Sequence, residues 1–138
     1  MENRELVMEA VKARKQAYCP YSGFAVGAAL LCVDDRVFTG CNIENAAYPA
    51  TNCAERTAIF KAVSEGKTEF RAIAIFGGPK GKEPENFCAP CGVCRQVMAE
   101  FCDPETFRII LMNGAGEIRE YLLKELLPLG FTGKALEI

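Results

Sequence analysis

The chain has 138 residues, half of them hydrophobic, and its formal net charge at pH 7 is −2. A chain of this length is expected to form one domain, residues 1–138, with a core that needs no disulfides. It has no run of Lys or Arg typical of a nucleic-acid or anionic-membrane surface, and no apolar run near the roughly 20 residues of a membrane span. The N-terminus lacks the apolar core of a signal peptide. We therefore expect a cytoplasmic protein with a small-molecule partner.

The predicted elements alternate between helices and strands. Apolar residues at helical spacing predict a helix over 3–18, ended by the turn at Pro20, and a mostly apolar run predicts a strand buried on both faces over 24–33. The later elements are a strand over 36–42, a helix capped by Thr51 or Asn52 and ending near 65, a strand over 71–77, a surface loop over 78–84, a helix from Pro90 to about 101, strands over 107–112 and 117–121, and a short helix over 122–127.

This order predicts an α/β protein, because strands lie before and between helices. The expected fold is a three-layer α-β-α sandwich with one mixed five-stranded sheet. No repeat, linker or low-complexity segment interrupts it.

Eight cysteines and the absence of histidine restrict the chemistry. Without histidine, Ser-His-Asp catalysis, Cys-His catalysis and every His-containing zinc site are excluded. In a reducing compartment the cysteines are candidates for metal binding, catalysis or burial. A proton shuttle near neutral pH must then be a carboxyl group with a raised pKa, a Lys with a lowered pKa, a Cys, a Tyr or metal-bound water.

Three cysteines fall at the predicted starts of two helices: Cys53 on one, and Cys91 and Cys94 on the next. The partial positive charge of a helix N-terminus stabilises the thiolates that a metal requires, and positions i and i+3 share a helix face. Three protein ligands would leave a tetrahedral zinc with an open fourth position, as in a catalytic site. Glu55, two residues after Cys53, could then relay protons, although a first-turn glutamate is also favoured by the helix dipole alone.

Cys88 leaves an alternative open, since Cys88, Cys91 and Cys94 form a CxxCxxC run. With Cys53 they could form a closed structural zinc site or hold an iron–sulfur cluster. The open site is favoured because Cys88 precedes Pro90 and should lie outside the helix turn. Arg56 is placed to donate to the ligand sulfurs and offset their charge, or else it is an exposed helix arginine.

Asn42 and Glu44 are two residues apart near the end of a predicted strand, so their side chains should share one face. They are either a solvated strand end or an amide–carboxylate pair for hydroxyl recognition. Spacing alone does not decide between the two.

Four segments together resemble the cytidine deaminase family. Cys53-Ala54-Glu55-Arg56 and Pro90-Cys91-Gly92-Val93-Cys94-Arg95-Gln96 are similar to its zinc site. Pro20-Tyr21-Ser22-Gly23-Phe24-Ala25-Val26-Gly27 is similar to its substrate segment, and Gly40-Cys41-Asn42-Ile43-Glu44-Asn45-Ala46-Ala47-Tyr48 to its sugar-binding segment. The similarity runs from the first helix to Phe131. The departures are a longer, more charged loop over 78–87 and the additional thiol of Cys88.

The resemblance implies the small homotetrameric class with three cysteines and one Zn²⁺ per subunit, acting on cytidine and deoxycytidine in pyrimidine salvage. It implies that Cys53, Cys91 and Cys94 hold zinc, that Glu55 is catalytic, and that Arg56 supports the ligands. It also implies that Asn42 and Glu44 bind the ribose 3′-hydroxyl, that Phe24 packs on the nucleoside, and that the backbone of Ala54 contacts the base. Tyr48 and Phe131 would complete the pockets of neighbouring subunits. A deaminase of another aminopyrimidine, such as blasticidin S, is the nearest rival, disfavoured by Asn42-Ile43-Glu44-Asn45.

Overall fold

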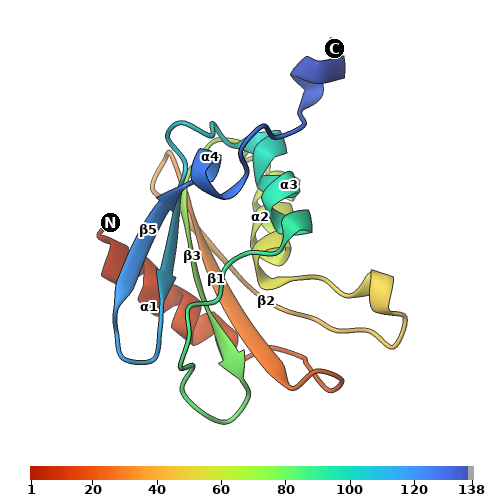
Figure 1. Cartoon of the computed structure of the whole chain (residues 1–138), viewed down its shortest axis with the longest axis vertical. Helices are drawn as coiled ribbons and strands as arrows, with labels where there is room; N and C mark the ends of the chain where they lie inside the picture. The colour runs from red at the N-terminus through yellow and green to blue at the C-terminus, as the bar shows by residue number, and fades with distance from the viewer. Residues whose placement is uncertain (137–138) are drawn as a thin grey trace.

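The computed structural model describes residues 1–136 and has a five-stranded sheet with helices on both faces (Figure 1). The elements are α1 (Asn3–Arg14), β1 (Phe24–Cys32), β2 (Val37–Cys41), the 3₁₀ turn η1 (Tyr48–Ala50), α2 (Ala54–Ser64), β3 (Phe70–Pro79), α3 (Gly92–Phe101), β4 (Arg108–Met112), β5 (Ile118–Leu122), α4 (Leu123–Leu126) and the 3₁₀ turn η2 (Gly133–Leu136). Within residues 1–136, no helix is both long and apolar enough to cross a membrane.

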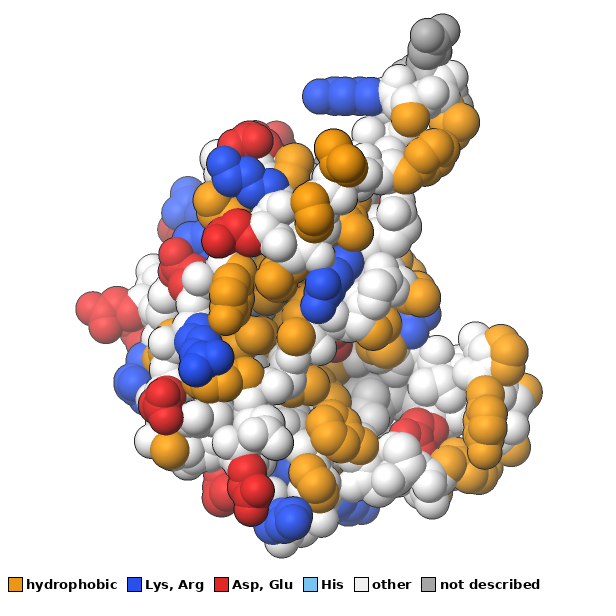
Figure 2. All heavy atoms as spheres, viewed as in Figure 1, with side chains coloured by type: hydrophobic (Ala, Val, Ile, Leu, Met, Phe, Trp, Pro, Cys, Tyr) orange, Lys and Arg blue, Asp and Glu red, His pale blue; other side chains and the backbone are white. Residues whose placement is uncertain are grey.

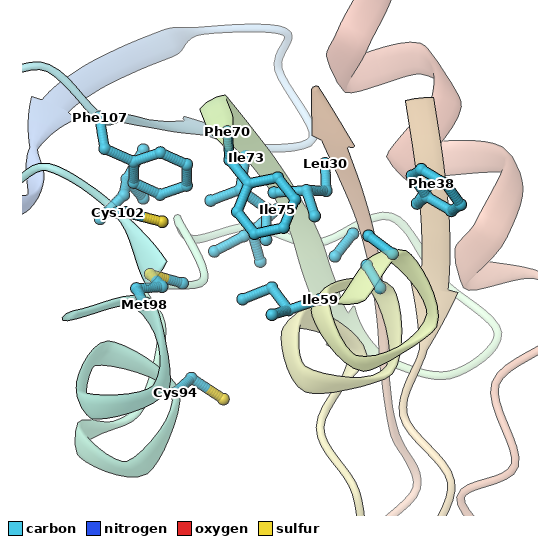
Figure 3. Close-up of a cluster of buried hydrophobic side chains, with 14 of the residues drawn as sticks. Leu30, Phe38, Ile59, Phe70, Ile73, Ile75, Cys94, Met98, Cys102 and Phe107 are labelled. Atoms are coloured by element: carbon cyan, nitrogen blue, oxygen red, sulfur yellow. The ribbon is translucent and has the colours of Figure 1, made fainter. Parts of the chain in front are cut away.

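The sheet is mixed, as the sequence predicts, and its strand order is β2-β1-β3-β4-β5. β3 and β4 run parallel, whereas the other neighbouring strands are antiparallel. The expected three layers are confirmed by two separate clusters of buried side chains. One cluster joins α1 to one face of the sheet, and the other joins α2 and α3 to the opposite face (Figure 3).

The chain connections explain why α2 and α3 begin next to each other. β2 and β3 are both antiparallel to β1, so β2 runs in the same direction as β3 and β4. α2 connects β2 to β3, α3 connects β3 to β4, and both helices pack in one core cluster. Each helix therefore starts near the carboxyl ends of these strands, where ligands bind in open α/β sheets.

Two glycines allow helices to lie directly on the sheet backbone. A Cβ atom on Gly27 of β1 would lie 2.0 Å from the carbonyl oxygen of Ala10 in α1. A Cβ atom on Gly40 of β2 would lie 2.5 Å from the carbonyl oxygen of Ala54, in the first turn of α2. Any larger residue at either position requires the helix to move.

Among the predicted boundaries that differ from the structure, three differ because the backbone finds a different partner. α1 ends at Arg14 rather than residue 18, since the Tyr18 N–H donates to the carbonyl of Asn42. Neither Thr51 nor Asn52 caps α2; Asn52 pairs with Ile43, and the N-cap is Cys53. β3 continues to Pro79 instead of giving way to a loop at residue 78, because its pairing with β1 extends that far.

Candidate active site

The thiols of Cys53, Cys91 and Cys94 lie within 4.8 Å of one another. Cys53 is the N-cap of α2, Cys91 is the N-cap of α3, and Cys94 lies in the first turn of α3. The Sγ atoms of Cys91 and Cys94 are 3.5 Å apart, and those of Cys53 and Cys91 are 3.9 Å apart. The adjacent starts of two helices thus gather three thiols from distant parts of the chain.

Interactions within this cluster favour a thiolate at Cys53. Hydrogen bonding from Cys94 lowers the pKa of Cys53 to about 5, with Arg56 contributing in the same direction and burial opposing. The pKa of Cys94 is raised, because its proton is held in the hydrogen bond to Cys53 and the thiol is buried. A cluster that already stabilises one thiolate is prepared to bind a cation.

The donor set fits zinc, because soft thiolates grouped this closely suit a tetrahedral metal. Arg56 donates from Nη2 to the Sγ of Cys53 over 3.0 Å. Its buried Nε has no hydrogen-bond partner within residues 1–136, so a second donor of the guanidinium is available beside the thiols.

Cys88 lies apart from the three grouped thiols. It precedes α3, as expected, and is not part of the cluster that could hold a metal. Its Sγ lies against β3, where a Cβ atom on Gly77 would be 3.1 Å away. Burial raises the pKa of this thiol to about 12, so it stays protonated.

The carboxyl group of Glu55 is buried in the first turn of α2, with 4 % of the residue exposed. Burial raises its pKa to about 7, and the nearby negative charge of Cys53 acts in the same direction. A carboxyl group with a pKa near the working pH can both accept and donate a proton.

A cavity of about 260 Å³ opens in front of the thiols and Glu55. Among the predicted site residues it is lined by Phe24, Asn42, Glu44, Cys53, Ala54, Glu55 and Cys91. Cys94 lies behind this wall, fully buried. Residues of the predicted substrate-binding, sugar-binding and metal-binding segments thus line one cavity.

Asn42 joins β2 to the start of β1 along the wall of this cavity. Its Oδ1 accepts from the Val26 N–H over 2.9 Å, and its Nδ2 donates to the Phe24 carbonyl over 2.8 Å. The side chain is buried, and these two bonds fix its orientation. It is therefore a rigid part of the cavity wall.

Glu44 holds the turn that leads into β1. Its Oε1 accepts from the N–H groups of Tyr21 and Ser22 over 2.9 and 3.1 Å, and its Oε2 accepts from the hydroxyl of Ser22. The bond from the Ser22 hydroxyl lowers the pKa of Glu44, so the group is a carboxylate at neutral pH. An anchored anion at the mouth of the cavity is a strong acceptor for a ligand hydroxyl.

Tyr48 and Phe131 do not line the cavity within one chain. Tyr48 is 73 % exposed and borders a separate hollow with Glu44 and Ser22, while Phe131 is 57 % exposed beyond α4. Both lie on segments that project from the body of the molecule, and hydrophobic side chains gather there (Figures 1 and 2).

Ser22, Thr51 and Ala89 also line the cavity, although the sequence assigns none of them an individual role in the site. Ser22 lies within the segment that resembles the family's substrate segment, and Thr51 is a predicted helix cap. The spacing of Ser22 and Glu44 carries no signal of their contact, because they are 22 positions apart.

A thiol triad and a buried glutamate at the starts of two helices, on one face of a mixed sheet, are typical of the zinc-dependent deaminases. Residues 1–110 match the family model for the cytidine and deoxycytidylate deaminase zinc-binding region. The chain therefore belongs to the cytidine and deoxycytidylate deaminase family, whose members are hydrolytic deaminases.

Known proteins agree with this assignment. A cytidine deaminase of Halalkalibacterium halodurans is 52 % identical over 134 residues, covering 97 % of each chain. The crystal structure of a cytidine deaminase from Burkholderia pseudomallei superposes with a TM-score of 0.86 at 47 % identity, covering 95 % of this chain and 100 % of the other. A blasticidin-S deaminase of Bacillus cereus is 33 % identical over 110 residues, covering 78 % of this chain and 76 % of the relative.

Proposed function

We propose that this chain is a zinc-dependent deaminase that hydrolyses cytidine and deoxycytidine to uridine and deoxyuridine plus ammonia, in pyrimidine salvage. The observation that carries the proposal is a single cavity that combines a buried carboxyl group of raised pKa, a metal-binding thiol cluster and an anchored carboxylate. The first two groups suit hydrolysis of an aromatic amine, and the third suits recognition of a sugar hydroxyl.

Cys53, Cys91 and Cys94 would hold one zinc ion per subunit, and Arg56 would offset the excess negative charge of three thiolates. When bound, zinc supplies the Lewis acidity that allows water to lose a proton near neutral pH. Cys88 has no part in this cluster, which favours an open catalytic site over a closed four-thiolate site.

Glu55 would move the protons of the reaction. It accepts a proton from the attacking water as the oxygen bonds to C4 of the pyrimidine, and it passes that proton to N3. It then carries the second proton of the water to the amino group, which leaves as ammonia while the C4 carbonyl forms. The raised pKa of Glu55 suits both the acceptance and the donation.

The other end of the cavity would bind the nucleoside. Glu44 accepts a hydrogen bond from the 3′-hydroxyl, and the fixed amide of Asn42 lies beside it. Phe24, partly exposed at the cavity, packs on the nucleoside, and the backbone of Ala54 contacts the base. A nucleoside is favoured over a free base as substrate because the Glu44 carboxylate, which accepts from the sugar hydroxyl, is charged and already oriented.

Blasticidin S is the second candidate substrate, since a blasticidin-S deaminase is among the relatives. The anchored Glu44 favours a ribose hydroxyl instead. The higher identity to a cytidine deaminase points in the same direction.

We further propose that residues 1–138 act as one deaminase domain in a cytoplasmic homotetramer. The exposed side chains of Tyr48 and Phe131 lie on projecting segments and are well placed to reach the cavity of a neighbouring copy. Reduced cysteines, which the metal site needs, suit the cytoplasm. Light scattering during gel filtration checks the tetramer.

Ammonia release from cytidine, deoxycytidine, cytosine and blasticidin S tests the proposed substrate class. Cytidine and deoxycytidine should be turned over far faster than cytosine and blasticidin S.

Glu55→Gln should retain zinc and fold but lose at least about 10²–10⁴-fold in kcat, the scale of acid–base contributions. Glu65→Gln, on the exposed end of the same helix, is the matched control. Near-normal turnover by Glu55→Gln would exclude the role assigned to Glu55.

A further inference from the structure

Arg14, the last residue of α1, joins three segments of the backbone and borders a hollow that is separate from the active-site cavity. Its Nε donates to the carbonyl of Ala25 over 2.8 Å. Its Nη2 lies 3.0 Å from the carbonyl oxygen of Gly78, 2.9 Å from that of Pro79 and 3.3 Å from that of Lys82. One side chain thus links the start of β1, the end of β3 and the loop that follows.

The position of Arg14 itself is tightly fixed. A Cβ atom on Gly27 would lie 2.5 Å from the backbone nitrogen of Arg14 and 2.9 Å from its Cα. The last turn of α1 therefore rests on β1 without an intervening side chain. The guanidinium also lies 5.6 Å from the ring centroid of Phe76 in β3. Because the backbone of Arg14 is held in place, its guanidinium can hold several carbonyl groups in one arrangement.

The segments that Arg14 joins carry residues of the cavity. Ala25 lies between Phe24 and Val26, which both line it. The loop from Lys80 to Phe87 leads directly into Cys88 and Ala89, which also line the cavity, and then to Cys91. A shift of either segment would therefore move a part of the cavity wall, Phe24 on one segment and Ala89 on the other.

The loop is also secured at points other than its contact with Arg14. Pro84 is fully buried, and its carbonyl accepts from the Gly114 N–H over 2.6 Å. The ring of Phe87 lies under the guanidinium of Arg119, 4.2 Å from its centroid. Near β3, the Lys80 N–H donates to the Gly23 carbonyl over 2.7 Å. Arg14 is the side chain that connects this near end of the loop to the start of β1.

We propose that Arg14 is a positioning residue for the nucleoside cavity, acting through the start of β1 and the loop over 80–87. Arg14 does not line the cavity; it sets the relative positions of the two walls, the segment that carries Phe24 and the segment that leads to Ala89. The inference rests on the proposed function only in that nucleoside is taken as the occupant of the cavity. Lysine cannot replace Arg14 fully, because a single ammonium group lacks the planar fork that reaches all these carbonyls.

Arg14→Met and Arg14→Lys test this role, with Arg4→Met as the matched control. Arg4 lies on the same helix and likewise donates to a backbone carbonyl, that of Gly116 over 3.0 Å, in a turn away from the cavity. Arg14→Met should raise KM for cytidine at least about tenfold, or about 1.4 kcal/mol, with little change in kcat, since ground-state and transition-state binding weaken together. The KM of Arg14→Lys for cytidine should lie between the values of the wild type and of Arg14→Met. Arg4→Met should lower the melting temperature without changing KM.

Hydrogen exchange gives a readout that does not depend on activity. Peptides covering residues 78–89 should exchange faster in Arg14→Met than in wild type, and at the wild-type rate in Arg4→Met. Equal KM values in the two Met variants, or unchanged exchange in Arg14→Met, would overturn the proposal. If the wild-type protein releases no ammonia from cytidine, the proposed function fails, whereas the exchange experiment still decides whether Arg14 holds the two walls.

Discussion

Arg56 donates from Nη2 to the sulfur of Cys53 over 3.0 Å, while its buried Nε has no partner within residues 1–136. One donor of the guanidinium, Nη2, is therefore bonded to the thiol cluster, and another, Nε, has no hydrogen bond to the described part of the chain. Three thiolates and one bound Zn²⁺ would carry a net charge of −1, which weakens a metal as a Lewis acid, and a donated hydrogen bond withdraws charge from the sulfur. The contact between Arg56 and Cys53 is therefore expected to affect both the affinity for zinc and the Lewis acidity of the bound ion.

Replacing Arg56 with Met should lower zinc affinity and kcat together, each by about 10–100-fold, the usual cost of losing a partner of a metal ligand. Competition with a chromogenic chelator measures the affinity, and ammonia release measures kcat. Arg71→Met is the control, because Arg71 is exposed on β3 and contacts Asp35 and the carbonyl of Val33. Unchanged zinc affinity in Arg56→Met would show that Arg56 only packs beside the site.

Glu44→Ala should reduce kcat/KM for cytidine by at least about tenfold more than for cytosine, because the proposed substrate contact of Glu44 is to the sugar and not to the base. Glu44 also fixes the turn at Tyr21 and Ser22, so a structural effect must be separated from a recognition effect. Ser22→Ala removes a hydroxyl donor to Glu44 and keeps the carboxylate. If Glu44→Ala impairs both substrates equally, Glu44 has no part in sugar recognition.

Cys88→Ser should retain one zinc per subunit and most of the activity, because Cys88 is not part of the thiol cluster. Cys91→Ser should lose zinc, since it removes one of the clustered sulfurs. Metal analysis after gel filtration compares the two variants. Loss of zinc from Cys88→Ser would instead support a closed site with four thiolates.

Glu120 connects α1, β4 and β5, and its pKa gives a pH-dependent contribution to stability. Its Oε1 accepts from Asn3 over 2.8 Å and lies 3.2 Å from Nη1 of Arg108. The bond from Asn3 and the contact with Arg108 lower the pKa of Glu120. The stabilisation is therefore complete above the unfolded pKa, about 4.3, and is lost as the pH falls through the lower folded pKa.

Glu120→Gln should accordingly reduce the free energy of unfolding at pH 7 by less than about 1 kcal/mol, because the pair is partly exposed. The difference from wild type should shrink as the pH falls below the unfolded pKa. Urea unfolding between pH 7 and pH 3 measures it. A difference that grows with acidity would contradict the assigned direction of the pKa shift.

Local sequence patterns predict most of the helices and strands and the thiol cluster at the centre of the site. Positions i and i+3, together with predicted helix starts, place Cys91 beside Cys94 and give Cys53 an equivalent position on α2. The strands follow from apolar runs, and their arrangement before and between helices predicts one mixed sheet covered on both faces. The strand order β2-β1-β3-β4-β5 is seen only in the structure.

The sequence could not show contacts that depend on tertiary geometry. Arg14 meets Lys82 across 68 positions, and Ser22 meets Glu44 across 22, with no periodic pattern to mark either pair. α1 stops at Arg14 because the chain beyond it finds partners on the segment after β2, although the apolar spacing continues. Spacing also does not decide whether Asn42 and Glu44 form a solvated strand end or a pair for hydroxyl recognition, because their surroundings include the start of β1, which is distant in the sequence.

Gly40 contributes no atom to the cavity, and yet it determines where the chemistry is located. Because the first turn of α2 rests on its bare Cα, the absence of a side chain at Gly40 sets how closely the start of α2, with Cys53 and Glu55, approaches β2. An added side chain would push this turn off β2 and shift Cys53 and Glu55 relative to Cys91 and Cys94. The positions of the reactive groups thus depend on a residue that carries no reactive group itself.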